Sequence, residues 1–121
     1  MRSLVAVLAT AAGLAGCGPG PVAPAPPASC PDDVPSGCVA PAPHFAADAA
    51  PIIAAHCAKC HTPGGMAANF PFQTYDQIAP YAGDINLQLQ TCQMPLPPEP
   101  PLSAAERQTM FGWILCGALD N

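Results

Sequence analysis

The chain has 121 residues, which is room for one small domain together with export and linker segments. Only 9% of its residues are charged, and 18 prolines and 10 glycines interrupt any long regular element. Half of the residues are hydrophobic, but many are alanine, and four Phe, two Tyr and one Trp make a marginal core. We therefore expect disulfides, a metal or a cofactor to stabilise the domain.

The formal net charge is −5. It becomes −6 if the N-terminal segment with Arg2 is removed, because Lys59 and Arg107 then stand against eight acidic residues. This balance argues against nucleic acid or an anionic membrane surface as an electrostatic partner. Protein partners that are steered by charge should present basic patches.

The N-terminus reads as an export signal. A short basic start precedes a largely apolar run, Leu4 to Leu14, which is too short to span a bilayer and has the length of a signal-peptide core. The next residues, Leu14-Ala15-Gly16-Cys17, resemble the bacterial lipoprotein signal, which implies a signal peptide over 1–16 and a lipid on Cys17. The protein would then be anchored in the cell envelope facing the periplasm, and Gly18 mildly favours the outer membrane. An ordinary signal peptide with a coincidental cysteine is the alternative.

Nine prolines lie between residues 18 and 43. Proline at this density favours an extended, semi-rigid spacer. We therefore divide the chain into the signal peptide, a lipidated Pro/Ala-rich tether over 17–43 and a folded domain over 44–121. Seven cysteines in an exported chain are consistent with an oxidising compartment.

The sequence Cys57-Ala58-Lys59-Cys60-His61 is the C-x-x-C-H signature of covalent haem attachment. Two cysteines three residues apart on one helical turn reach the two vinyl groups at one edge of a porphyrin. The adjacent histidine then lies under the macrocycle with its imidazole directed at the iron. The motif predicts one haem c bound through Cys57 and Cys60, with His61 as an axial ligand.

Three other interpretations compete for this motif. A zinc ribbon needs a second ligand pair at close spacing, whereas Cys92 and Cys116 stand alone and 24 residues apart. A thioredoxin-like redox pair needs a preceding strand, and no β-branched strand precedes Cys57. A chance structural disulfide would not require the histidine.

A helix is expected to lead into the motif. Asp48 can cap a helix running from about 49 to 60, and Pro51 in its first turn loses no needed N–H. Phe45 could pack just ahead of the cap.

Two further helix starts have a capping-box pattern. Thr74-x-x-Gln77 and Ser103-x-x-Glu106 predict helices that begin near 75 and 104, the second continuing at helical apolar spacing to Leu119. No hairpin signal occurs. We predict an all-α fold of three or four short helices joined by Pro/Gly loops.

Met94 is the best candidate for a second axial ligand. Met66 follows His61 by only five residues and would need a nearly taut chain to reach the opposite haem face. Met110 belongs to the apolar pattern of the last helix. Met94 precedes Pro95 and a proline-rich stretch that stiffens the loop presenting it.

The remaining histidines are weaker ligand candidates. His56 precedes Cys57 on the same helix and cannot easily turn to the far haem face, and His44 lies in the tether. We expect both side chains to be solvated or locally hydrogen-bonded.

These features resemble the small class I-type cytochrome c domains of bacterial envelope proteins. The motifs that carry the resemblance are Ile52-Ile53 before C-x-x-C-H, Met94-Pro95, Leu102-Ser103-x-x-Glu106, Trp113-Ile114 and Cys116-Gly117-Ala118. The resemblance covers roughly residues 44–119. It implies a helical bundle around one covalent haem, with Cys57, Cys60 and His61 as haem-binding residues and Met94 as the axial methionine. The His61–Met94 spacing is shorter than in most mitochondrial-type members.

Four cysteines remain after lipid and haem are assigned, namely Cys30, Cys38, Cys92 and Cys116, and most members of the family lack the last two. Four cysteines allow three disulfide pairings. We expect 30–38, because these residues flank a turn-rich part of the tether, and 92–116, which would tie the methionine loop to the last helix.

The expected function is one-electron transfer between redox donor and acceptor proteins, without enzymatic catalysis. A haem-based sensor or peroxidase-like protein is one alternative and requires that Met94 be absent from the iron or easily displaced. A cofactor-free lipoprotein with all its cysteines in disulfides is the other.

Overall fold

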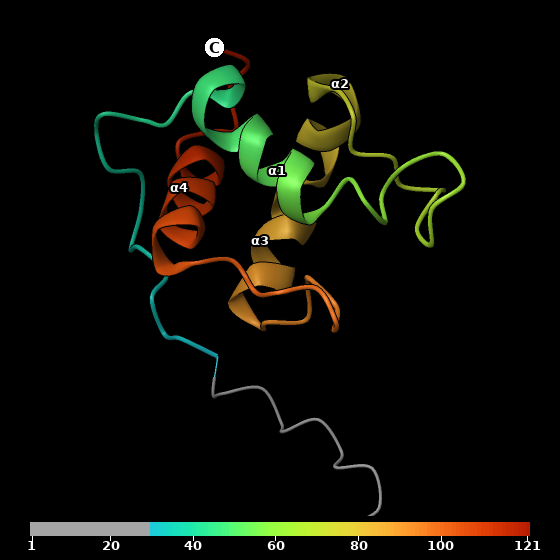
Figure 1. Ribbon diagram of the computed structural model, residues 1–121. Helices are drawn as coiled ribbons and strands as arrows, with labels where there is room; N and C mark the ends of the chain where they lie inside the picture. Colours follow the sequence, from blue (N-terminus) through green and yellow to red (C-terminus); the bar gives the residue numbers. More distant parts are fainter. Residues whose placement is uncertain (1–29) are drawn as a thin grey trace, which may run out of the picture.

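The computed structural model describes residues 30–121, and the predicted signal peptide and Cys17 lie outside this range. Its regular elements are all helical, which confirms the all-α expectation for this part of the chain (Figure 1). In chain order they are the π-helical turn η1 (Phe45–Ala49), α1 (Ala50–His56), α2 (Tyr75–Ile78), the 3-10 turn η2 (Ala79–Tyr81), α3 (Ala82–Gln90) and α4 (Ala104–Leu115).

The first helical segment begins earlier than predicted. Its first residue is Phe45, and the Asp48 carboxylate accepts a hydrogen bond from the His44 backbone N–H at 2.7 Å instead of capping a helix that starts after it. Asp48, the fourth residue of the segment, thus reaches back across the first turn to the N–H of the residue that precedes it. Pro51 lies in the first turn of α1, as expected.

Only one of the two predicted capping boxes forms. At the start of α4, the Ser103 hydroxyl accepts from the Glu106 N–H at 3.3 Å, and the Glu106 carboxylate accepts from the Ser103 N–H at 2.8 Å. At the start of α2 the Thr74 side chain makes no such bond, and the Gln77 amide oxygen accepts from the Gln73 N–H. The helix nevertheless begins at Tyr75, where the sequence placed it.

The end of α4 is set by a glycine. The helix stops at Leu115 instead of Leu119, because Gly117 has a φ of 100° and only a residue without Cβ adopts this conformation at little cost. The N–H groups of Gly117 and Ala118 donate to the carbonyls of Ile114 and Trp113, at 3.0 and 2.9 Å. These bonds form a Schellman motif, which satisfies the last carbonyls of the helix.

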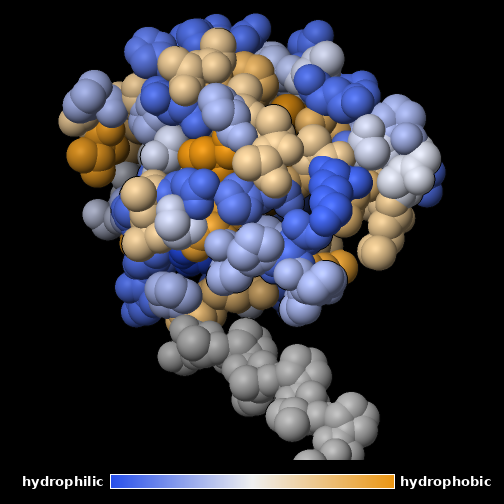
Figure 2. Space-filling view, in the orientation of Figure 1, coloured by the Kyte–Doolittle hydropathy of each residue, from blue (hydrophilic) through white to orange (hydrophobic). Residues whose placement is uncertain are grey.

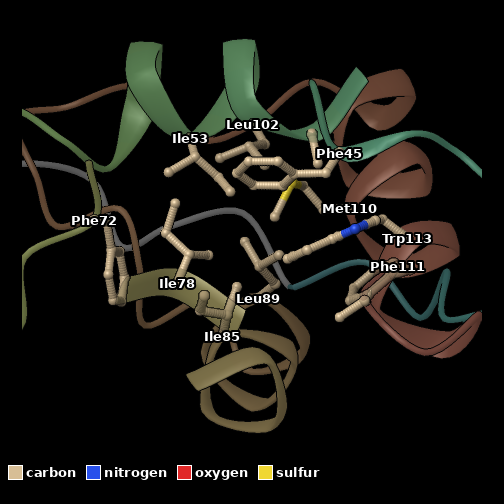
Figure 3. Packing of buried hydrophobic residues seen from close by; sticks show 12 residues of the cluster. Phe45, Ile53, Phe72, Ile78, Ile85, Leu89, Leu102, Met110, Phe111 and Trp113 are labelled. Atoms are coloured by element: carbon tan, nitrogen blue, oxygen red, sulfur yellow. The ribbon is translucent and has the colours of Figure 1, made fainter. Parts of the chain in front are cut away.

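The core lies where α4 meets η1, α1 and α3 (Figure 3). Trp113, Phe111, Ile53 and Met110 are its largest fully buried side chains, so Met110 is a core residue as expected. The Phe45 ring lies 5.5 Å from that of Trp113, between centroids, and Figure 3 shows both beside Met110. Removing these few large side chains from water contributes to the free energy of folding.

The predicted disulfide pairing is wrong. Cys30 is bonded to Cys92 and Cys38 to Cys116, so both bridges cross from the predicted tether to the helical domain. The physical reason is that residues 30–43, which we call the strap, run extended beside α4 instead of closing a loop on themselves (Figure 1). The packed unit therefore includes the strap and begins before the expected boundary at 44.

The surface of this unit mixes polar and apolar side chains on the face that Figure 2 presents. Within residues 30–121, no helix is both long enough and apolar enough to cross a bilayer.

Removing the Cys38–Cys116 bridge should strongly destabilise the protein. We expect the double variant Cys38→Ser, Cys116→Ser to lose about 2–5 kcal/mol of unfolding free energy, because the bridge closes a long loop in a small domain. Urea unfolding measures the loss. Mass spectrometry of a non-reduced digest provides the control, and a 30–38 or 92–116 peptide pair would contradict the structure.

Candidate functional site

An apolar cavity of about 530 Å³ opens between the end of α1, the face of α3 and the loop that precedes α4. Its volume falls within the range of roughly 300–1,000 Å³ typical of cofactor and ligand sites. The lining comes from three segments: His56, Cys57, Cys60, His61, Met66, Ala67, Phe70 and Phe72; Tyr81, Asp84, Ile85, Gln88 and Leu89; and Met94, Pro95, Leu96, Glu99 and Leu102.

The two motif cysteines are presented by one turn at the end of α1. The Cys57 N–H still donates to Ile53 O of the helix at 2.8 Å, and the N–H groups of Cys60 and His61 both donate to the Cys57 carbonyl. This turn places both cysteines on the cavity wall. Neither sulfur takes part in a disulfide, which leaves both available for covalent attachment.

The His61 imidazole is oriented by two contacts. Its Nδ1 lies 2.9 Å from the backbone carbonyl of Phe70, and its ring stacks on that of Phe72 with centroids 4.3 Å apart. Because a carbonyl oxygen only accepts, Nδ1 is the donor, and the Nε2 lone pair stays free for a metal. A backbone carbonyl that orients a histidine in this way is a common second contact around metal ligands.

The loop after His61 folds tightly back on the motif. The Ala67 N–H donates to the Cys60 carbonyl at 3.0 Å. A Cβ added at Gly65 would lie 2.3 Å from that same carbonyl oxygen, so only glycine fits this position without a backbone shift.

Two of the methionines considered as ligands line the cavity. Met94 does so with 37% of its surface exposed, from the proline-rich loop on the side formed by residues 94–102. Met66, whose short distance from His61 in the sequence disfavours it as a ligand, also borders the cavity but is 83% exposed. The structure thus brings Met94 and the C-x-x-C-H motif to one cavity across 33 residues of chain.

The side chains of the other two histidines, His56 and His44, differ in their surroundings. His56 Nε2 lies 3.0 Å from a carboxylate oxygen of Glu106, which turns the ring toward α4. The Ser103 hydroxyl and N–H, followed by His56, lower the pKa of Glu106 to about 2, so this partner stays ionised at ordinary pH. His44 is exposed and does not border the cavity. His56 is hydrogen-bonded as expected, but to a residue 50 positions away on α4 and not to a near neighbour in the chain.

An ion pair links the two sides of the cavity. Lys59, inside the C-x-x-C-H motif, is paired with Glu99 of the proline-rich loop, and this bond raises the pKa of Lys59. The pair could not be predicted from the sequence, because nothing in either local pattern indicates that the two residues are neighbours.

The cysteine geometry disfavours two of the competing interpretations. Cys92 and Cys116, the residues a zinc ribbon would require, are both taken up in disulfides. The element directly before Cys57 is the helix α1, whereas a thioredoxin-like cysteine pair is preceded by a strand. Burial, reinforced by the neighbouring Cys60, raises the pKa of the Cys57 thiol to about 11, the opposite of a thiol activated for redox exchange.

Comparisons with family models, curated proteins and solved structures find no match to this chain. The cavity is therefore interpreted from its own geometry and chemistry.

Replacing Gly65 with alanine should disturb the turn that presents Cys60. We expect Gly65→Ala to lower the unfolding free energy by about 1–3 kcal/mol, the usual range for forced overpacking. Gly83→Ala is the matched control, since no atom lies within 4 Å of its added Cβ and alanine favours the helix. Thermal unfolding of both variants measures the difference, and equal melting temperatures would refute the close contact.

Alkylation of Cys57 should show a strongly raised pKa. In haem-free folded protein, the iodoacetamide rate at Cys57 should rise about tenfold per pH unit from 7 to 10, because only the thiolate reacts. In urea the rate should level off near the ordinary pKa of 9.0. Peptide mass spectrometry follows the site, and a plateau below pH 9 in the folded protein would contradict its burial.

Proposed function

We propose that this protein is an envelope-anchored c-type cytochrome that carries single electrons through one covalent haem with histidine and methionine axial ligands. The observation that carries the proposal is the common cavity. Both thiols, the free Nε2 edge of His61 and the Met94 side chain belong to residues that border it. A bound haem supplies a one-electron redox couple.

Each residue has a distinct part in holding such a group. Cys57 and Cys60 attach it through their sulfurs, and His61 provides an iron ligand whose orientation the Phe70 carbonyl maintains. Met94 provides the second ligand, which raises the reduction potential relative to two nitrogen ligands. Apolar side chains of α3, among them Ile85 and Leu89, exclude water from the site.

The cofactor-free alternative requires all available cysteines to be in disulfides. Within residues 30–121, the four cysteines outside the motif are paired with one another, and Cys57 and Cys60 are left unbonded beside a large apolar cavity. This selective arrangement favours cofactor attachment.

The charge of the described surface suggests the kind of redox partner. The two basic residues of the described chain are Lys59, which is exposed, and Arg107, which is buried, and both are already in ion pairs, with Glu99 and Asp33. The net field around the protein is therefore negative, and donor and acceptor proteins with basic docking surfaces would associate faster. With a lipid on Cys17, the protein would face the periplasm from a membrane surface, the outer membrane being mildly favoured.

Exchange of Met94 tests both cofactor and ligand. In protein matured with haem-ligation machinery, the pigment should stay with the polypeptide through acid–acetone extraction. The ferric methionine-to-iron band should be present in the wild type, disappear in Met94→Ala, and be accompanied by a lower reduction potential. Absorption spectra and redox titration supply the measurements.

Met66→Ala is the matched control, since Met66 also borders the cavity and should leave the band intact. Loss of the band in Met66→Ala but not in Met94→Ala would show that Met66, and not Met94, is the ligand. A five-coordinate wild-type spectrum would favour the sensor or peroxidase-like alternative, and release of all pigment by acid–acetone would refute covalent attachment.

A further inference from the structure

We propose that Arg107 and Asp33 are positioning residues for Met94: their buried ion pair clamps the strap against the start of the loop that presents the methionine. This inference rests on the proposed function, since it assigns the two residues a role in iron ligation that is exerted through Met94. Neither residue borders the cavity itself.

Among residues 30–121, Arg107 is the one charged residue that is buried, with 5% of its surface exposed. Its Nε lies 2.9 Å and its Nη2 2.6 Å from the Asp33 carboxylate oxygens, a two-pronged contact between α4 and the strap. Its Nη1 donates to Leu89 O near the end of α3 at 2.7 Å. The guanidinium also lies 5.0 Å above the Phe111 ring centroid. One side chain therefore joins the strap, α3 and α4.

The strap is joined to the methionine loop by a covalent bond. Cys30 lies three residues before Asp33, and its disulfide partner Cys92 lies two residues before Met94. Arg107 Nη1 approaches the Cys92 sulfur to 3.8 Å. The ion pair and the disulfide thus form a closed ring of contacts from α4 through the strap to the loop and back to Arg107.

The loop begins where α3 ends, and Arg107 contacts this point. Cys92 has a φ of 52° as the left-handed residue of a Schellman motif, in which the N–H groups of Cys92 and Gln93 donate to the carbonyls of Leu89 and Gln88 at 3.2 and 3.0 Å. The Leu89 carbonyl of this motif is also the one that accepts from Arg107. Leu89 and Leu102, which lie on either side of the loop in the chain, both border the cavity. A shift at the start of the loop would therefore change the position of Met94 relative to the cavity.

The clamp should act over the whole ordinary pH range. Its hydrogen bonds to Arg107 hold the pKa of Asp33 below the usual value, so the carboxylate remains charged until the solution is strongly acidic. The stabilisation from the ion pair is fully present above the pKa that Asp33 has in the unfolded chain. It is lost only as the pH falls through the lower pKa that Asp33 has in the folded protein.

The test compares Asp33→Asn with Asp32→Asn in the ferric holoprotein. Both remove one carboxylate from the strap, but Asp32 is exposed and makes none of the contacts to Arg107. Imidazole is the probe, because it binds the iron only after methionine leaves it. We expect Asp33→Asn to bind imidazole about tenfold more tightly, a change equivalent to about 1.4 kcal/mol. Asp32→Asn should stay within about twofold of wild type.

Hydrogen exchange in residues 91–101 provides a readout that does not depend on the ligand assignment. Faster exchange there in Asp33→Asn, with exchange in α1 unchanged, supports the clamp. If Asp33→Asn lowers only the global stability, while imidazole affinity and loop exchange match wild type, the pair is merely structural and the proposal is overturned.

A wild-type spectrum without the methionine-to-iron band would refute the ligand assignment in the proposed function, and the exchange data would still measure the clamp. Should Asp33→Asn fail to fold, the double variant Asp33→Leu, Arg107→Met removes both charges together and avoids leaving one unpaired. It should fold and still bind imidazole more tightly than wild type, and a wild-type affinity in this variant would overturn the proposal.

Discussion

Two disulfides hold the strap and the helical domain together as one packed unit. They join residues 62 and 78 positions apart in a domain whose core contains few large side chains. Cross-links over such distances restrict the unfolded chain strongly, which compensates for a small hydrophobic core. They also fix the strap beside α4, where Asp33 meets Arg107 and neutralises a buried charge. Without the strap, that charge would lack its partner.

The core and the proposed haem site share side chains. Ile85, Leu89 and Leu102 are buried in the apolar cluster and also border the cavity. A cofactor bound there would extend the core, which is consistent with a domain that has little apolar surface of its own to bury. Folding and cofactor binding are then coupled, because a ligand that binds only the folded state stabilises it.

The two proposed iron ligands are supported in different ways. His61 is oriented by Phe70 and Phe72, which follow it closely in the chain. Met94 lies on a long loop whose start is held by Cys30 through a disulfide and whose proline-rich part is paired with Lys59 through Glu99. One side of the site is therefore built from local sequence, whereas the other depends on contacts between distant segments.

The amino-acid sequence was sufficient to predict the features that depend on residues close together in the chain. It predicted the all-helical class, the helix starts at Tyr75 and Ala104 and the capping box at Ser103, because backbone N–H groups at a helix start are satisfied within a few residues. It also predicted that the C-x-x-C-H motif and Met94 belong to the same site. The haem itself remains a prediction from that motif.

The path of the strap and the pairing of the cysteines could not be predicted from local patterns, because both depend on contacts between distant segments. Proximity in the sequence predicts the pair 30–38, and support of the methionine loop predicts 92–116, but disulfide pairing follows the path of the chain in space. That path brings Asp33 to Arg107 across 74 residues, and no local pattern encodes such a contact. The same holds for Met66, because whether its loop reaches the cavity depends on how residues 62–72 fold back on Cys60.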